Sequence, residues 1–347
     1  MKLAVRAQNP LEWVALQMNL APVPVVQTSL YALASRALCE AVELGVFEAV
    51  GRGSPTHGEL AAATGLDPRA LDALVHLLVT LGYLADVAGR LRVTPLSRKW
   101  LLEDSETSVC AALRLFRAQW AVYDHSPSYL RTGKGFAGQT VMHHDTWSVY
   151  QKAMFQLARM GVAEVAKKTP LPPAPRRMLD VGGSHGLYSV HFCRRVPAMR
   201  AEVLDLPEAI ESAAALLASV NAERRVQHRA GDVLETDLGE AVYDVVLVSS
   251  VVHVFDDGDN RQIVANLARA LRPGGRLYLQ DFVRPDAGTR ADAVSSAQNL
   301  FFSTMSAGGV YSIAEQQGWQ REAGLEPLAV TRFLSTPLVQ VSARKPP

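Results

Sequence analysis

The stretch RMLDVGGSHGLYSVHFCRRVPAMRAEVLD, residues 177–205, decides the fold of this 347-residue chain. It has the pattern of an apolar strand that enters a glycine turn, then a helix, then a second apolar strand. The alternation continues with predicted strands at 226–232, 243–255 and 276–283 and predicted helices at 208–220 and 260–272. Apolar strands alternating with helices are typical of a parallel sheet with helices on both faces. The sequence therefore predicts an α/β, doubly wound domain.

Three strand ends of this domain carry residues suited to an adenosine ligand. Ligands of such sheets lie beyond the carboxyl ends of the strands, so residues just after each strand are the candidates. Gly182, Gly183 and Ser184 follow the first strand, Asp205 ends the second and Asp232 ends the third. Carboxylates can accept hydrogen bonds from ribose hydroxyls and from the adenine amine. The turn has neither the G-x-G-x-x-G nor the P-loop pattern, and each aspartate alone also fits a helix cap, so only the three ends together indicate adenosine.

The first 105 residues predict a winged helix. Its signals are a helix from Gln27 closed by Gly45, a capping box at Thr56 and Glu59, a second helix from Pro68, and a hairpin around Gly89. The second helix offers only Arg69 and His76 for reading DNA bases and is apolar nearly all round. Such a helix has to be buried, which favours self-association or domain packing over DNA binding.

The chain divides into three predicted regions: 1–105, the winged-helix domain; 106–170, a helical bridge; and 171–347, the α/β domain. The bridge is rich in aromatic residues, which suit either core packing or the wall of a pocket for a flat substrate. Four prolines between Pro170 and Pro175 mark the boundary with the α/β domain.

Composition narrows the possible partners and the compartment. Lys plus Arg number 35 and Asp plus Glu 34, a net charge of +1 that gives no general attraction to nucleic acid. Three widely spaced cysteines offer no disulfide framework, which favours a reducing, cytoplasmic setting. The N-terminus lacks the pattern of a secretory signal. Residues 13–35 carry no charge, yet prolines and amides interrupt them, so we expect a buried arm rather than a membrane span.

A metal ion is not expected from the sequence. His143 and His144 are adjacent, which is poor spacing for two ligands of one metal ion on a helix. Only Asp145 accompanies them. The prediction is a metal-independent protein.

The chain resembles the S-adenosylmethionine-dependent small-molecule O-methyltransferases of the plant caffeate and acetylserotonin type, which have many bacterial members in secondary metabolism. The likeness is carried by LDVGGSHG, VLDLPE, GDVLE, VVHVFDDGDNRQIVANLARALRPGGRLYLQD and AGGVYSIAEQQGWQREAGL. It covers nearly the whole chain, because these enzymes also carry an N-terminal winged-helix dimerisation domain. The resemblance implies a Rossmann-like methyltransferase domain, a homodimer, S-adenosylmethionine as cofactor with S-adenosylhomocysteine as product, and an aromatic natural product, such as an antibiotic precursor, as acceptor.

The same resemblance implies roles for individual residues. The cofactor would be held by Gly182, Gly183, Ser184, Asp205, Leu206, Asp232, Val233 and Ser249. The acceptor would contact Trp147, Met154 and Phe302, and His253 would be the general base. A phenol, with a pKa of about 10, is mostly protonated at neutral pH, so methyl transfer to its oxygen gains from such a base.

Departures from the family pattern leave the orientation of His253 open. The family's Glu, Asp and Lys or Arg are replaced by Tyr311, Val254 and Ser249. Either His253 is a weaker base, or Asp256, Asp257 or another residue orients it.

Two alternatives to O-methylation remain open from the sequence. The first alternative keeps the fold and changes the reaction. It would be methylation at carbon or nitrogen, or a hydroxylation or decarboxylation that uses the cofactor without methyl transfer. In a different class, the chain is a ligand-sensing DNA-binding regulator, against which the sparse positive charge of the second N-terminal helix argues.

Overall fold

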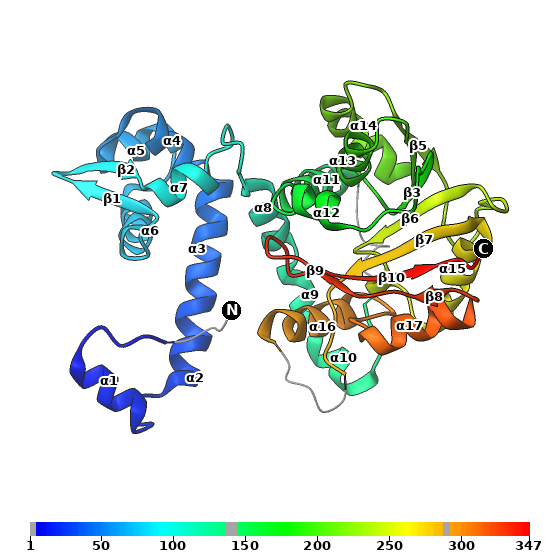
Figure 1. Cartoon of the computed structure of the whole chain (residues 1–347). Coiled ribbons are helices and arrows are strands. Elements are labelled where there is room, and N and C mark those ends of the chain that lie inside the picture. Colours follow the sequence, from blue (N-terminus) through cyan, green and yellow to red (C-terminus); the bar gives the residue numbers. More distant parts are fainter. Residues whose placement is uncertain (1–4, 137–143, 287–291) are drawn as a thin grey trace. The chain divides into compact units, whose positions relative to one another are not determined.

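A computed structural model describes residues 5–136, 144–286 and 292–347 of the chain, without the side chains of 144–146. The chain forms two compact units, Met1–Gln119 and Trp120–Pro347 (Figure 1). The segment 106–170, predicted as a helical bridge, is shared between these units.

The first unit contains the predicted winged helix. Its elements are α1 (Pro10–Gln17), α2 (Val23–Val26), a π-helical turn (Gln27–Tyr31), α3 (Ala32–Glu43), α4 (Val46–Gly53), α5 (His57–Thr64), α6 (Pro68–Thr80), β1 (Leu84–Val87), β2 (Arg90–Val93), α7 (Pro95–Trp100) and α8 (Cys110–Ala118). The capping box of Thr56 and Glu59 is confirmed, and β1 and β2 pair as an antiparallel hairpin. Helix α6 buries Leu71, Val75 and Leu78 in the core of this unit.

The N-terminal arm differs from the expectation. Helices α1 and α2 and the π-helical turn bury no residue, and Leu11 and Trp13 are 83% and 59% exposed. The prediction that residues 13–35 are buried is therefore wrong for the single chain. No helix among the described residues is long and apolar enough to cross a membrane.

The second unit contains the α/β domain. Its elements are α9 (Trp120–Asp124), α10 (Ser126–Thr132), α11 (His144–Arg159), α12 (Val162–Lys168), β3 (Arg177–Val181), α13 (Leu187–Arg195), β4 (Arg200–Asp205), α14 (Pro207–Val220), β5 (Val226–Ala230), β6 (Tyr243–Ser249), a 3-10 turn (Val252–Val254), α15 (Asp257–Ala270), β7 (Leu271–Asp281), α16 (Ala293–Met305), α17 (Ile313–Glu322), β8 (Glu326–Pro327), β9 (Thr331–Arg332) and β10 (Val339–Arg344). All five predicted strands are present.

The central sheet is mixed rather than wholly parallel. Its strand order is β5-β4-β3-β6-β7-β10-β8, with β9 also paired to β10. Strands β3 to β7 are parallel, whereas β10 runs antiparallel to β7, β8 and β9. An antiparallel strand needs no crossover helix, so the strand and helix alternation gave no sign of it. The strand order reverses between β3 and β6, where ligands of such sheets bind.

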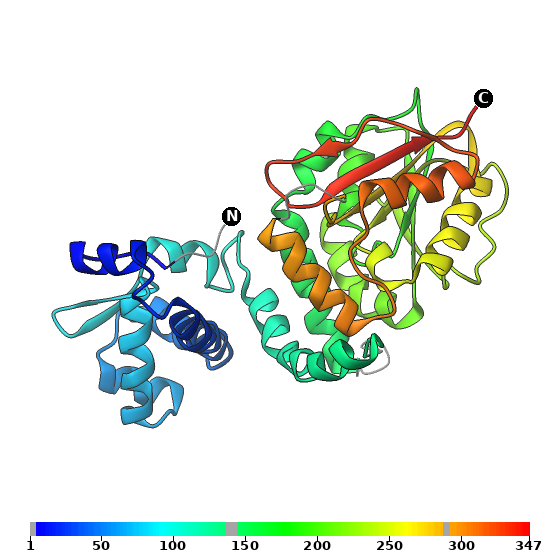
Figure 2. The same cartoon turned by 90° about the horizontal axis from the view of Figure 1, so that it is seen from below.

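Helices cover both faces of the sheet (Figures 1 and 2). Alternate residues of each strand point to opposite faces, so neighbouring positions enter different cores. Met178 of β3 packs with α12 and α13, whereas Leu179 packs with α15 and α17. Burial on both faces explains why the strands are almost continuously apolar.

The fourth predicted strand, 243–255, is shorter in the structure. Strand β6 ends at Ser249 because Ser250 has a φ of 57°, outside the range of a strand. The chain then forms the 3-10 turn Val252–Val254, which contains His253. His253 therefore lies in a turn beyond the carboxyl end of β6.

Candidate active site

The turn between β3 and α13 begins with glycines that pack too closely for side chains. Gly182 has a φ of 61°, and a Cβ atom there would lie 2.5 Å from Cγ2 of Val251. A Cβ on Gly183 would lie 2.5 Å from the carboxyl carbon of Asp180. The N–H of Gly182 donates to the Leu204 carbonyl of β4 at 2.8 Å. The glycines therefore let the turn fold tightly over the ends of two strands.

Ser184 joins this turn to the end of β4. Its backbone N–H donates to one carboxylate oxygen of Asp205 at 2.9 Å, and the N–H of Leu206 donates to the other at 2.9 Å. Burial nevertheless raises the pKa of Asp205 above its usual value, although these two bonds and nearby His228 lower it. Of the residues predicted to hold the cofactor, Ser184, Asp205 and Leu206 are brought together.

Asp180, within β3, is a buried carboxylate that the sequence reasoning did not single out. Its Oδ2 accepts a hydrogen bond from the Ser189 hydroxyl at 2.7 Å, whereas its buried Oδ1 has no partner among the described residues. Burial, together with nearby Asp205, raises the pKa of Asp180 to about 7. An unpartnered buried oxygen on an acid is costly unless a donor or a positive charge satisfies it.

The other predicted cofactor residues follow β5 and β6. Asp232 lies two residues after the end of β5, and its Oδ1 accepts the Leu234 N–H at 2.9 Å. Val233 is buried in the core shared with α15. Ser249 ends β6, and its hydroxyl oxygen accepts a hydrogen bond from Nε2 of Gln280 at 3.0 Å. All three lie at the same edge of the sheet as the glycine turn, since parallel strands end together.

His253 forms a hydrogen-bond contact with Asp281, the last residue of β7. Its Nδ1 lies 2.9 Å from both carboxylate oxygens of Asp281. The two side chains are buried, with His253 6% and Asp281 1% exposed as residues. Because the carboxylate can only accept, Nδ1 carries the proton, and Nε2 is left with a lone pair. This tautomer is the one that a general base at Nε2 requires.

The structure also shows which acids do not orient His253. Asp256 caps α15 by accepting the Asp259 N–H at 2.9 Å, and Asp257 accepts the indole N–H of Trp319 at 2.8 Å. Among the alternatives that the sequence left open, the residue in contact with His253 is neither Asp256 nor Asp257 but Asp281. Tyr311 donates its hydroxyl to the Phe255 carbonyl at 2.7 Å, which fixes the chain just after the histidine.

Helix α16 supports the ring and the backbone of His253. Phe302 stacks on the imidazole with ring centroids 3.6 Å apart and planes 18° apart. The Ser306 hydroxyl donates to the His253 carbonyl at 3.1 Å. A Cβ on Gly308 would lie 2.4 Å from that same carbonyl oxygen, so only glycine lets the chain pass there. Predicted acceptor residue Phe302 thus contacts the predicted base directly.

The other two predicted acceptor residues, Trp147 and Met154, lie on α11. Trp147 meets Tyr150 of the same helix edge to face, at 5.8 Å between ring centroids. Burial raises the pKa of Tyr150 to about 12, and the charges of Asp205 and Asp281 add to the rise. Tyr150 is therefore close enough to both Asp205 and Asp281 for their charges to affect its pKa.

Asp281 is the functional residue that the sequence reasoning missed, although a signal was available. It ends the fifth strand, so the rule that selected Asp205 at the end of the second strand also applies to it. What the rule could not supply was its pairing with a histidine 28 residues away.

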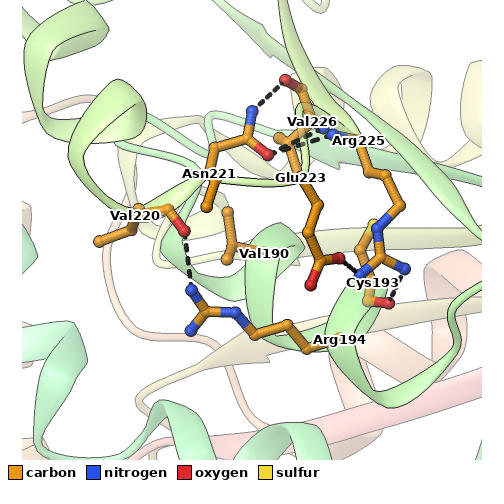
Figure 3. A pocket seen from close by; sticks show the side chains of 9 residues that line it. Val190, Cys193, Arg194, Val220, Asn221, Glu223, Arg225 and Val226 are labelled. Atoms are coloured by element: carbon orange, nitrogen blue, oxygen red, sulfur yellow. Dashed lines mark hydrogen bonds and ion pairs between the residues drawn. The ribbon is translucent and has the colours of Figure 1, made fainter.

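A small hollow on the second unit has too little volume to hold a cofactor or an acceptor. It lies at the amino end of β5, has a volume of about 10 Å³, and holds about one water molecule (Figure 3). Arg194 donates to the Val220 carbonyl there, and Arg225 pairs with Glu223. These contacts tie the ends of α13 and α14 to β5, which is a structural role.

Metal ligands are not gathered anywhere in the described ranges. No group of three or more His, Cys, Asp and Glu side chains among those residues could hold a metal ion. His143 and the side chain of His144 lie outside the described part of the chain.

Two models of known protein families match this chain. A model of the O-methyltransferase domain matches residues 122–326, and a model of the O-methyltransferase dimerisation domain matches residues 26–103. The chain belongs to the O-methyltransferase family. It is therefore an S-adenosylmethionine-dependent enzyme with O-methyltransferase activity, and its first unit carries a dimerisation domain.

Individual relatives agree with the family. The chain is 26% identical over 313 residues to 3-hydroxy-5-methyl-1-naphthoate 3-O-methyltransferase of Streptomyces sahachiroi, covering 87% of this chain and 88% of that protein. It is 30% identical over 267 residues to 3-amino-4-hydroxybenzoate 4-O-methyltransferase of Streptomyces cremeus, covering 71% and 69%. The fold matches human N-acetylserotonin methyltransferase in complex with S-adenosylmethionine, with a TM-score of 0.82, 18% identity, and coverage of 99% and 100%.

Proposed function

We propose that this methyltransferase methylates a hydroxyl of a small aromatic natural product, with His253 as the general base that removes the hydroxyl proton. The observation that carries the proposal is the buried contact between Nδ1 of His253 and the Asp281 carboxylate. This contact supports a histidine whose Nε2 is held ready to accept a proton. As Nε2 gains the proton, the Asp281 charge stabilises the resulting imidazolium.

The cofactor end has residues that fit a positively charged donor. When bound, S-adenosylmethionine supplies an electrophilic methyl group on a sulfonium and carries an ammonium on its methionine part. The unpartnered, buried Oδ1 of Asp180 belongs to an acid that such a cation would satisfy. We propose that Gly182, Gly183 and Ser184 line the methionine part. Asp205, Leu206, Asp232 and Val233 would hold ribose and adenine, and Ser249 would complete the cofactor contacts.

The side chains beside His253 support an aromatic acceptor. Phe302 contacts both Phe301 and Phe282, and Phe301 also meets Tyr123. These rings, together with Trp147 and Met154 of α11, offer apolar faces on which a flat acceptor can pack. The relatives named for hydroxynaphthoate and hydroxybenzoate acceptors are consistent with this class. Packing would align the acceptor oxygen with the methyl group in a water-poor pocket.

Labelled methyl transfer tests the proposal. The enzyme is incubated with S-adenosylmethionine labelled in its methyl group and with a panel of hydroxylated naphthoates and benzoates. Label is expected in the hydroxy compounds and not in the matched methyl ethers. His253→Ala should lower kcat by about 10²–10⁴-fold, as expected for loss of a general base. The control His76→Ala changes an exposed histidine of the first unit. A loss below tenfold in His253→Ala, or label at carbon or nitrogen, would contradict the proposed base.

We further propose that the enzyme is a cytoplasmic homodimer that binds neither nucleic acid nor membrane. Large apolar residues of the first unit are exposed in the single chain, among them Leu30 and Leu33 at 57% and 62%. A second copy covering them would remove this apolar surface from water. Sedimentation of the enzyme as a monomer at micromolar concentration would contradict the homodimer.

A further inference from the structure

Ser184 lies in the turn 182–187 between β3 and α13, called the cofactor turn below, and has an unusual backbone conformation there. It has a φ of 53°, a left-handed conformation that is costly for a residue with a side chain. Three parts of this one residue bond three different elements. Its N–H donates to Asp205 of β4, its carbonyl lies 2.8 Å from Nε2 of His228 in β5, and its hydroxyl donates to Gln151 of α11. A glycine would adopt this backbone freely but could not make the third contact.

Gln151 receives the serine hydroxyl from a buried position. It is 1% exposed, and its Nε2 donates to the Ala209 carbonyl of α14 at 3.3 Å. Both ends of its amide are therefore used, which fixes its orientation. Its neighbours along the helix, Lys152 and Ala153, differ in exposure: Lys152 is exposed and Ala153 buried. Gln151 thus links the cofactor turn to the inner face of α11.

His185 makes a second contact between the same turn and the same helix. Its Nδ1 accepts the Leu187 N–H at 3.1 Å, so the proton of the neutral ring is on Nε2. Phe155 meets the imidazole edge to face, with centroids 5.3 Å apart. Burial lowers the pKa of His185 to about 4, which keeps one donor and one acceptor on the ring at neutral pH.

We propose that these two contacts, the Ser184 hydroxyl with Gln151 and the His185 ring with Phe155, couple cofactor binding to the acceptor helix α11. The inference rests on the proposed cofactor site in the turn after β3. Helix α11 carries the proposed acceptor residues Trp147 and Met154, so a turn fixed by the cofactor also fixes that wall of the acceptor pocket. Gln151 and His185 are therefore positioning residues. By thermodynamic linkage, a cofactor that orders α11 favours the acceptor, and the acceptor favours the cofactor equally.

Hydrogen exchange with S-adenosylhomocysteine tests this coupling without an acceptor. In the wild-type enzyme, saturating S-adenosylhomocysteine should slow amide exchange both in the turn 182–187 and in α11, by roughly fivefold or more. In Gln151→Met and Ser184→Ala, protection of the turn should remain while the extra protection of α11 is lost. Calorimetry should show less than a tenfold change in the affinity of Gln151→Met for S-adenosylhomocysteine.

Two further variants separate coupling from damage to the fold. Lys152→Met changes the exposed neighbour of Gln151 and should retain full protection of α11. Ser184→Gly removes the hydroxyl while relieving the left-handed backbone, so it should fold and still lose the protection of α11. Unchanged protection of α11 in Gln151→Met overturns the inference, as does binding to the wild type without protection of α11. No binding heat with the wild type overturns the proposed cofactor site as well, which distinguishes the two failures.

Discussion

The two ends of the proposed site differ in how far the chain itself satisfies their charged groups. At the base end, Nδ1 of His253 meets both oxygens of Asp281, and Phe302 supports the ring. At the cofactor end, Asp180 keeps a buried oxygen without a partner among the described residues, and its pKa is raised to about 7. The base end is thus assembled by folding, whereas the cofactor end needs a positively charged ligand to complete it.

The largest expected effect comes from breaking the completed pair at the base end. Asp281→Asn keeps the shape of the side chain but removes the charge that stabilises the imidazolium and selects the Nδ1–H tautomer. We expect kcat to fall by roughly 100-fold or more at saturating substrates. Steady-state kinetics with the labelled cofactor measures this fall.

Asp256→Asn is the matched control for that variant. Asp256 is close to His253 in sequence but caps α15, and asparagine caps helices about equally well. Its kcat should stay within about twofold of wild type, because the cap contributes to folding rather than to the base. If Asp256→Asn and Asp281→Asn were equally impaired, Asp281 would lose its assigned role.

The second effect concerns binding at the cofactor end. Asp205→Asn removes a partly buried charged acceptor, whose hydrogen bonds contribute about 1.5–3 kcal/mol each. We expect the affinity for S-adenosylhomocysteine to fall by roughly 10- to 100-fold, while kcat at saturating cofactor changes much less. Titration calorimetry measures the affinity. Glu202→Gln, earlier on β4 and engaged with Arg177, is the control and should leave the affinity unchanged.

The third effect is a pH dependence of the affinity for S-adenosylhomocysteine, which we expect from Asp180 at the cofactor end. The ammonium group of the ligand favours ionised Asp180, so binding must release a proton wherever the free enzyme holds one on this residue, below a pH of about 7. The affinity for S-adenosylhomocysteine should be full above that pH and fall about tenfold per pH unit below it. Asp180→Asn should bind more weakly at pH 8 and show no such slope between pH 6 and 8.

The same shift predicts how stability changes in the free enzyme. The folded pKa of Asp180 is above the unfolded value, so the folded state binds more protons between about pH 4 and 7, and this residue's contribution to stability falls as pH rises through that window. Asp180→Asn should therefore raise the Tm of the free enzyme at pH 8. A lower Tm together with an unchanged pH slope in binding would show that Asp180 does not face the ligand.

The smallest effect comes from loosening the base end without changing its charge. Phe302→Leu keeps an apolar side chain but removes the ring that stacks on His253. An aromatic pair contributes about 0.5–1.5 kcal/mol, so kcat should fall about two- to tenfold. Leu300→Ala, at a residue of α16 that is 49% exposed, is the control and should leave kcat unchanged. Equal kcat in both variants would show that Phe302 does not support the base.

Sequence patterns predicted the framework well where the signal is local. The strand and helix alternation after Arg177 predicted all five parallel strands, and the Thr56 capping box predicted where α5 begins. The antiparallel strand β10 was missed because its pairing with β7 has no local signature. The N-terminal arm was expected to be buried, and its exposure in the single chain depends on what lies beside it.

The sequence by itself determined the family and the parallel core, and it supplied the residues that we propose for the cofactor end of the site. Gly182, Ser184 and Asp205 follow directly from strand ends, and parallel strands bring their carboxyl ends to one edge. Only the tertiary structure decided that Asp281 pairs with His253 and that Phe302 stacks on it. Those contacts depend on β7 lying next to β6 and on α16 packing over their ends, which no periodicity within one segment specifies.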